Sequence, residues 1–175
     1  MITFLVGGAR SGKSTLAVEL GRRHPGPVVF VATAEPFDDD LRARVDAHRA
    51  ERPEWPTVEA PVELAAAVAD TPADALVVVD CLTVWVGNLF HHLDGEPARR
   101  AAYDAVVTAL TSRSGHTVVV SNEVGLGLHP DTSLGREYRD ELGRLNQRVA
   151  ALADRSLFLV AGRALALTDP WEVLS

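Results

Sequence analysis

The chain has 175 residues, of which 47% are hydrophobic and 23% charged, which is enough for one domain with a buried core. Its net charge of −7 argues against nucleic acid or an anionic membrane as the main partner. Cys81 is the only cysteine, which excludes an intrachain disulfide and fits a reducing cytoplasm. The opening apolar run, 2–6, is too short for a signal peptide or a membrane span.

Apolar runs alternate with helical patterns, which predicts an α/β fold with a mostly parallel sheet and helices on both faces, in a single domain 1–175. The runs are continuous in Val, Leu, Ile and Phe, as is typical of strands buried on both faces. The expected strands are 2–6, 28–33, 57–60 at an edge, 75–80, 117–122, 156–161 and 164–168. The expected helices are 13–23, 38–51, 62–70, 81–92, 97–113 and 134–154.

The stretch GGARSGKST at 7–15 follows the first expected strand and opens the first helix. It contains the only lysine of the chain, Lys13, among seventeen basic residues. Its first eight residues match G-x-x-x-x-G-K-[ST], the pattern of a phosphate-binding loop in its proper strand-to-helix context. The candidate nucleotide-binding residues of this loop are Gly7, Gly8, Ala9, Arg10, Ser11, Gly12, Lys13 and Ser14.

This loop has a specific chemistry. Its glycines let successive backbone N–H groups point at phosphate oxygens, and the following helix adds its positive N-terminal end. Lys13 would reach the β- and γ-phosphates as a compact charge, a role that the forked guanidinium of arginine does not fill. Ser14 would offer its hydroxyl to Mg²⁺. The alternative is a glycine-rich turn that only joins a strand to a helix.

Asp80 ends the apolar run 76–79, where a second, acidic partner for Mg²⁺ is expected. The alternative is a strand end followed by a helix cap. The Asn-Lys-x-Asp motif that reads guanine in switch GTPases is excluded, since Lys13 is the only lysine. A small-molecule kinase or a nucleotidyltransferase fits the length best.

His48 lies on the expected helix 38–51 with Arg44 one turn before it and Arg49 and Arg52 after it. The arginines favour a neutral, nucleophilic imidazole and can bind phosphates in bidentate fashion. Attack of a ring nitrogen on an α-phosphorus would form a phosphoramidate and expel pyrophosphate. The alternative is a solvated basic helix face with His48 as a packing residue.

Seven segments in this order resemble the bifunctional adenosylcobinamide kinase/adenosylcobinamide-phosphate guanylyltransferase family over nearly the whole length. They are GGARSGKS (7–14), VATAEPFDDD (31–40), ARVDAHRAERPEW (43–55), TVEAP (57–61), VVVDCLTVWVGNL (77–89), SNEVGLGLHP (121–130) and GREYRDELGRLNQRVAALAD (135–154). The resemblance implies a RecA-like P-loop NTPase fold and a homotrimer.

The resemblance also implies two reactions: phosphorylation of adenosylcobinamide by ATP or GTP, then transfer of GMP from GTP to adenosylcobinamide phosphate through a guanylylated histidine, here His48. The nucleotide contacts it implies are Ala32, Thr33, Ala34, Arg49, Ala50, Glu51, Arg52, Glu59 and Asp80.

Some assignments remain open on the sequence alone. Glu59 can accept two N–H bonds from a guanine edge, or it is an exposed acid on an edge strand. Asn122 follows a strand at the end where α/β sheets bind ligands, or it only caps or turns the chain. Two other functions also remain open, a simple small-molecule kinase with a structural His48 and a regulatory nucleotide-binding module.

Overall fold

The computed structural model describes residues 1–35, 49 and 53–174. The expected helix 38–51 therefore lies outside the described residues except for Arg49, which is helical. The other expected elements are all present, with ends that differ by one or two residues. In chain order they are β1 (Ile2–Gly7), α1 (Lys13–Arg22), β2 (Val28–Ala32), β3 (Thr57–Glu59), α3 (Leu64–Ala69), β4 (Leu76–Asp80), α4 (Leu82–His92), α5 (Gly95–Ser112), β5 (Thr117–Asn122), α6 (Ser133–Leu152), β6 (Arg155–Val160), β7 (Arg163–Leu167) and α7 (Pro170–Leu174).

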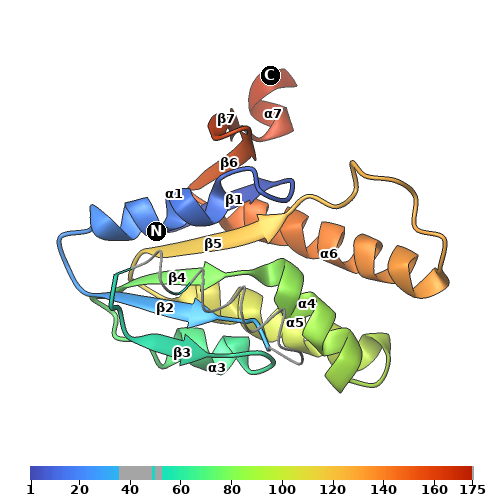
Figure 1. The fold of residues 1–175 in the computed structure, drawn as a ribbon, viewed down its shortest axis with the longest axis horizontal. Coiled ribbons are helices and arrows are strands. Elements are labelled where there is room, and N and C mark those ends of the chain that lie inside the picture. The colour runs from blue at the N-terminus through green and yellow to red at the C-terminus, as the bar shows by residue number, and fades with distance from the viewer. Residues whose placement is uncertain (36–48, 50–52, 175) are drawn as a thin grey trace.

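The seven strands form one sheet in the order β3-β2-β4-β5-β1-β6-β7, which Figure 1 shows from bottom to top. All neighbouring pairs from β3 to β6 are parallel, and only β6 and β7 pair antiparallel. Ala161 (φ +50°) and Gly162 (φ +72°) make the turn between these two strands. The predicted mostly parallel sheet is confirmed.

The central strands are buried because helices cover both faces of the sheet. Phe4, Val77 and Val79 point to the face covered by α3, α4, α5 and α6. Leu5 and Val78, which alternate with them, belong to the smaller core under α1. This two-sided burial is the physical reason why the strands read as unbroken apolar runs.

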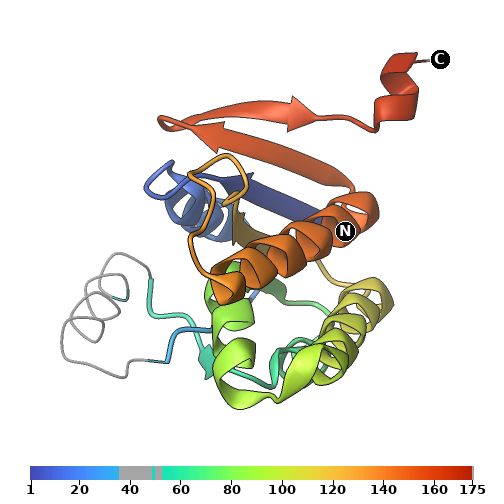
Figure 2. The same cartoon turned by 90° about the vertical axis from the view of Figure 1, so that its right-hand side faces the viewer.

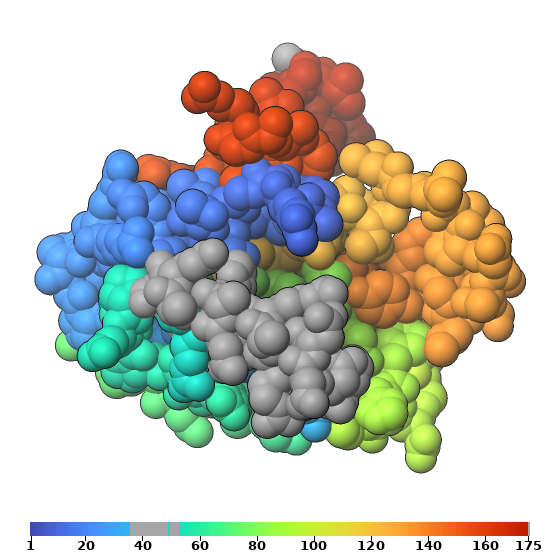
Figure 3. Space-filling view, in the orientation of Figure 1, coloured from blue at the N-terminus to red at the C-terminus, as the bar shows by residue number. Residues whose placement is uncertain are grey.

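The β6–β7 hairpin and α7 stand at one end of the molecule and project from it (Figures 1, 2 and 3). Leu165 and Trp171 are 66% and 76% exposed there, and every residue of β7 is exposed. None of the helices in the described parts of the chain is long and apolar enough to cross a membrane.

Parallel strands bring their carboxyl ends to a common edge of the sheet. At this edge β1 leads into the loop 8–12, β4 ends at Asp80 and β5 ends at Asn122. The register pairs Ala32 with Asp80 and Gly7 with Asn122. The edge where α/β sheets bind ligands therefore carries the sequence-predicted phosphate loop and the acid at the end of β4.

Candidate active site

The loop between β1 and α1 has the backbone of a phosphate cradle. Gly12 has φ +101°, a left-handed conformation that glycine adopts without a steric penalty. Gly7 lies so close to β6 that a Cβ there would come within 2.3 Å of the Leu159 carbonyl oxygen. The N–H of Gly162 donates to the Ser11 carbonyl (3.0 Å), which joins the loop to the β6–β7 turn. These contacts hold the loop over the N-terminal end of α1, where anions bind favourably.

Lys13 opens α1 and is only 6% exposed, which is unusual for a lysine. Its Nζ donates to the Gly8 carbonyl (2.6 Å) and lies 3.4 Å from Ser11 Oγ. Burial lowers the pKa of the ammonium, and the nearby Cys81 and the Asp80 carboxylate act in the opposite direction. The ammonium of Lys13 is therefore buried inside the loop. There it contacts the Gly8 carbonyl and the Ser11 hydroxyl, which phosphate oxygens can replace.

A cavity of about 580 Å³ opens beside the loop. Ten of the sequence-predicted residues line it: Ala9, Arg10, Ser11, Gly12, Lys13, Ser14, Ala32, Ala34, Arg49 and Asp80. The structure thus brings together the loop, the end of β2, the acid of β4 and one arginine from the predicted 38–51 helix. Six further residues line the cavity. One is Asn122, for which the sequence left a ligand-binding role and a capping role open, and the other five were not among the predicted contacts: Thr15, Phe30, Cys81, Val84 and Val120.

Four predicted contacts do not line this cavity, namely Gly7, Gly8, Thr33 and Glu59. Gly8 still reaches the site through its carbonyl, which accepts from Lys13. Glu59 is exposed at the end of β3, the edge strand of the sheet. The remaining predicted residues, His48, Ala50, Glu51 and Arg52, lie outside the described residues.

Thr33 is fully buried and joins the ends of β2 and β4. Its Oγ1 accepts from the Cys81 N–H (2.9 Å) and donates to the Cys81 carbonyl (2.8 Å). The Thr33 N–H also donates to the Asp80 carbonyl (3.2 Å). In this structure the hydroxyl holds the backbone that carries Asp80, and it is not a wall of the cavity.

One signal points to two of these six residues, namely a position at the carboxyl end of a buried strand. Cys81 and Asn122 stand at the carboxyl ends of β4 and β5, the position that predicted Asp80 and made Asn122 a candidate. In the loop that follows Asn122 the leucines are exposed to solvent, Leu126 to 79% and Leu128 to 97%. Phe30 and Val120 carry no local signal, because apolar strand residues are common throughout the sheet.

Comparison with solved structures shows the fold. A protein of Pyrococcus horikoshii OT3 superposes with a TM-score of 0.56 at 7% identity, covering 94% of this chain and 84% of its own. An ATPase of a bacterial type III secretion system reaches 0.55 at 11% identity, covering 99% of this chain and 60% of its own. The predicted P-loop, RecA-like fold is confirmed.

Comparison with protein sequences is more specific. The chain is similar to the bifunctional adenosylcobalamin biosynthesis protein CobP of Pseudomonas aeruginosa, with 40% identity over 95% of this chain and 97% of the relative. It is also similar to the bifunctional adenosylcobalamin biosynthesis protein CobU of Salmonella typhimurium, with 36% identity over 93% and 97%. A family model described as cobinamide kinase / cobinamide phosphate guanyltransferase matches residues 3–167. The chain, with its phosphate loop and the adjoining cavity, therefore belongs to the cobinamide kinase / cobinamide phosphate guanyltransferase family.

Proposed function

We propose that this chain carries out both reactions of its family in the cavity beside the phosphate loop. It phosphorylates the hydroxyl of adenosylcobinamide with ATP or GTP, and it transfers GMP from GTP to adenosylcobinamide phosphate. The observation that carries the proposal is the convergence of Lys13, Asp80 and Arg49 on one cavity of about 580 Å³. A phosphate cradle, an acid and a cation are the groups that nucleotide chemistry requires.

In the kinase step, Lys13 exchanges its contact with the Gly8 carbonyl for β- and γ-phosphate oxygens. The ammonium stays close to the charge that spreads over the γ-phosphoryl oxygens as the group moves. The bond from the γ-phosphorus to the bridging oxygen breaks, and a bond to the acceptor oxygen forms. The nucleoside diphosphate leaves with the electron pair of the broken bond, and the acceptor hydroxyl releases its proton to water.

Mg²⁺ fits this site because Ser14 and Asp80, which both line the cavity, carry a hydroxyl and a carboxylate, the oxygen ligands that the ion prefers. Mg²⁺ prefers one or two such protein ligands together with substrate phosphates, rather than a closed protein cage. The described residues contain no cluster of three or more His, Cys, Asp or Glu that could hold a metal ion. Ser14 and Asp80 would hold the ion at the loop, where it would neutralise phosphate charge.

In the transferase step, we assign the nucleophile to His48, which lies outside the described residues. Its neighbour in the chain, Arg49, is exposed and lines the cavity, which supports a place for this segment at the nucleotide. A ring nitrogen of His48 attacks the α-phosphorus of GTP and pyrophosphate leaves. The acceptor's phosphate oxygen then attacks the same phosphorus and releases the histidine.

Two broader features belong to the same proposal. Assembly into a homotrimer, implied by the family resemblance, is supported by the exposed apolar residues Leu165, Trp171 and Leu174 on the projecting β7–α7 end. A cytoplasmic location is supported by the single cysteine, since the chain needs no disulfide.

The test is incubation with α-³²P-GTP and Mg²⁺ without corrinoid, followed by denaturation. We expect an acid-labile, alkali-stable label on the wild type and on His91→Ala, a control at an exposed histidine, and none on His48→Ala. Label retained on His48→Ala would place GMP on another residue. Nucleotide binding without any label would leave a simple kinase, which consumes ATP only with cobinamide present, or a regulatory module, which needs no acceptor.

A further inference from the structure

Asn122 occupies the last position of β5, the strand between the two that carry the phosphate loop and Asp80. It pairs in register with Gly7, the first residue of the loop motif, and it lines the cavity. Arg49 and Ala34 also line the cavity. Ala34 follows β2, and β4 lies between β2 and β5, so Ala34 marks the opposite end of the cavity from Asn122. Asn122 therefore lies beside the phosphate loop, in the part of the cavity where the loop and Lys13 would bind the terminal phosphate.

The backbone of Asn122 is held on both sides by side chains from two helices. Its N–H donates to Thr83 Oγ1 on α4 (2.7 Å), and its carbonyl accepts from Asn146 Nδ2 on α6 (3.0 Å). Asn146 is 7% exposed, and its Oδ1 accepts from the buried hydroxyl of Ser121 (2.7 Å). The Thr83 carbonyl in turn accepts from the Tyr138 hydroxyl (3.0 Å). This network fixes the position from which the Asn122 side chain starts.

The side-chain amide of Asn122, in contrast, has no hydrogen-bond partner within residues 1–35, 49 and 53–174. It caps no helix of the described chain, because Thr132 Oγ1 caps α6. It makes no turn there either, because Glu123 Oε1 accepts from the Gly125 N–H (2.6 Å) and performs that task. A carboxamide on a fixed backbone, facing a phosphate cavity without a protein partner, is a preorganised donor for a ligand.

We propose that the Asn122 carboxamide donates a hydrogen bond to a γ-phosphate oxygen of the bound nucleotide and stabilises the charge on the γ-phosphoryl group during transfer to cobinamide. Asn122 exchanges no proton with the substrate. Thr83 and Asn146 act as positioning residues through its backbone. The inference rests on the proposed kinase reaction and adds a specific contact to it. It also separates the two reactions, because the γ-phosphate reacts in the kinase step but leaves within pyrophosphate in the guanylyl step.

The first experiment measures binding and needs no catalysis. Dissociation constants are compared for the β,γ-imido analogue of GTP and for GDP, each with Mg²⁺, on the wild type and Asn122→Ala. Loss of a hydrogen bond to a charged group predicts about tenfold or more weaker binding of the analogue. Binding of GDP should stay within about twofold of the wild type. Equal weakening of both nucleotides, or of neither, overturns the proposal even if the chain proves not to phosphorylate cobinamide.

The second experiment measures both reactions. Removal of a transition-state donor predicts that Asn122→Ala lowers the kinase kcat about a hundredfold, with a smaller change in KM for cobinamide. Labelling by α-³²P-GTP should remain, which shows that folding and the guanylyl step survive. Glu123→Ala is the matched control, since among the described residues its carboxylate contacts only the neighbouring turn and Glu123 is not a lining residue of the cavity. Parallel loss of both activities in Asn122→Ala would indicate a structural role and overturn the proposal.

The positioning residues have their own signature. Thr83→Val keeps the shape of the side chain but removes the oxygen that accepts the Asn122 N–H. We expect the kinase kcat of Thr83→Val to fall about tenfold with GDP binding retained, and Thr83→Ser to restore it. Failure of the serine variant to restore kcat would overturn the positioning role of this hydroxyl.

Discussion

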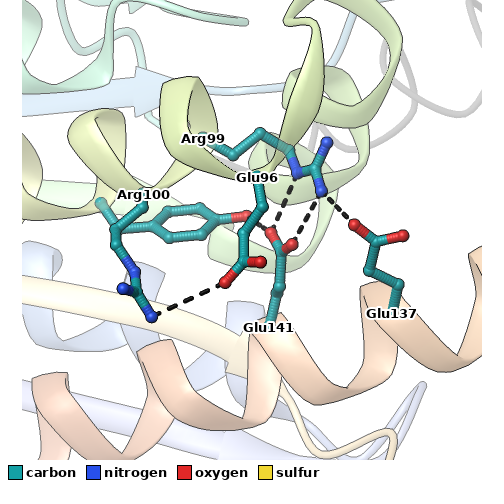
Figure 4. Close-up of polar contacts among 6 residues, drawn as sticks. Glu96, Arg99, Arg100, Glu137 and Glu141 are labelled. Carbon is teal, nitrogen blue, oxygen red and sulfur yellow. Dashed lines mark hydrogen bonds and ion pairs between the residues drawn. The ribbon is translucent and has the colours of Figure 1, made fainter.

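A buried ion pair between α5 and α6 gives the sharpest prediction of stability. The guanidinium of Arg99 donates to both carboxylate oxygens of Glu141, from Nε (3.0 Å) and Nη2 (2.8 Å). Tyr103 donates its hydroxyl to the same carboxylate (2.6 Å), and Glu137 is a second partner of Arg99 (Figure 4). Arg99 and Glu141 have side chains only 6% and 4% exposed. The perturbation is Glu141→Leu, which leaves the Arg99 charge and the Tyr103 hydroxyl without their main partner.

The magnitude follows from this burial. Removal of one partner from a buried, hydrogen-bonded ion pair typically costs about 3–5 kcal/mol, because the remaining charge stays desolvated. Glu137 is 49% exposed, so it compensates only in part. For a chain of this size the loss corresponds to a decrease in Tm of about 6–20 °C. The double variant Arg99→Leu/Glu141→Leu should recover most of the loss, because it leaves no buried charge.

The assay is urea unfolding followed by circular dichroism, with the same substitution at Glu96 as control. Glu96 pairs with Arg100 at 3.6 Å on the surface of α5, with side chains 55% and 67% exposed (Figure 4). Such a pair contributes about 0–1 kcal/mol, so Glu96→Leu should unfold close to the wild type. A loss below about 1 kcal/mol for Glu141→Leu would refute the reasoning, since the pair would then behave as a solvated one.

The stability contributed by the Arg99–Glu141 pair should depend on pH. Burial alone would raise the pKa of Glu141, but hydrogen bonds from Arg99 and Tyr103 outweigh it and hold the pKa below its ordinary value of 4.5. A carboxyl with a lowered folded-state pKa contributes stability that is present above pH 4.5 and is lost as the pH falls through the folded-state pKa. In urea unfolding at decreasing pH, Glu141→Leu should therefore lose less stability below pH 4.5 than the wild type does, and an equal loss would contradict this.

Three further predictions concern other parts of the chain. Burial, with help from the Asp80 carboxylate, raises the pKa of Cys81 from 9.0 to about 11. Iodoacetamide at pH 8 should therefore alkylate Cys81 about a hundredfold more slowly than a peptide thiol, and a comparable rate would contradict this. Burial, followed by the N-terminal amine, lowers the pKa of His116 below 6.5, so its contribution to stability is present above pH 6.5 and is lost as the pH falls through the folded-state pKa. His116→Gln should therefore lose less stability than the wild type between pH 7 and 5 in urea unfolding, and an unchanged difference would count against the assignment. Gly7→Ala should cost about 1–3 kcal/mol, because its Cβ would lie 2.3 Å from a backbone oxygen of β6, whereas Gly8→Ala has nothing within 4 Å and should unfold like the wild type.

Much of the fold could be predicted from the sequence because its signals are local. The strands of the central sheet are unbroken apolar runs, which only two-sided burial explains. Element ends were less predictable, because they depend on partners elsewhere in the chain. β2 stops at Ala32 since the next residue, Thr33, bonds to Cys81, 48 residues away. The antiparallel direction of β7 depends on the tight turn at Ala161 and Gly162.

The residues of the candidate site also fall into those that a local pattern predicts and those whose position depends on distant parts of the chain. The residues of the phosphate loop are contiguous, so their pattern alone located Lys13 and Ser14 at the cavity. Glu59 stands on the edge strand in register with Ala32, which lines the cavity, but it is not a lining residue itself, and strand order is not a local property. The assignment of His48 remains a prediction from the sequence and the family.

By itself, then, the sequence determined the phosphate loop, the central strands and the family, because each can be recognised from neighbouring residues or from motifs in a fixed order. Only the tertiary structure decided which side chains share the cavity and which are buried together. Asn122 is held by side chains 39 and 24 residues away, and Arg99 meets Glu141 across 42 residues. Such contacts arise from strand order and helix packing, so no local pattern encodes them.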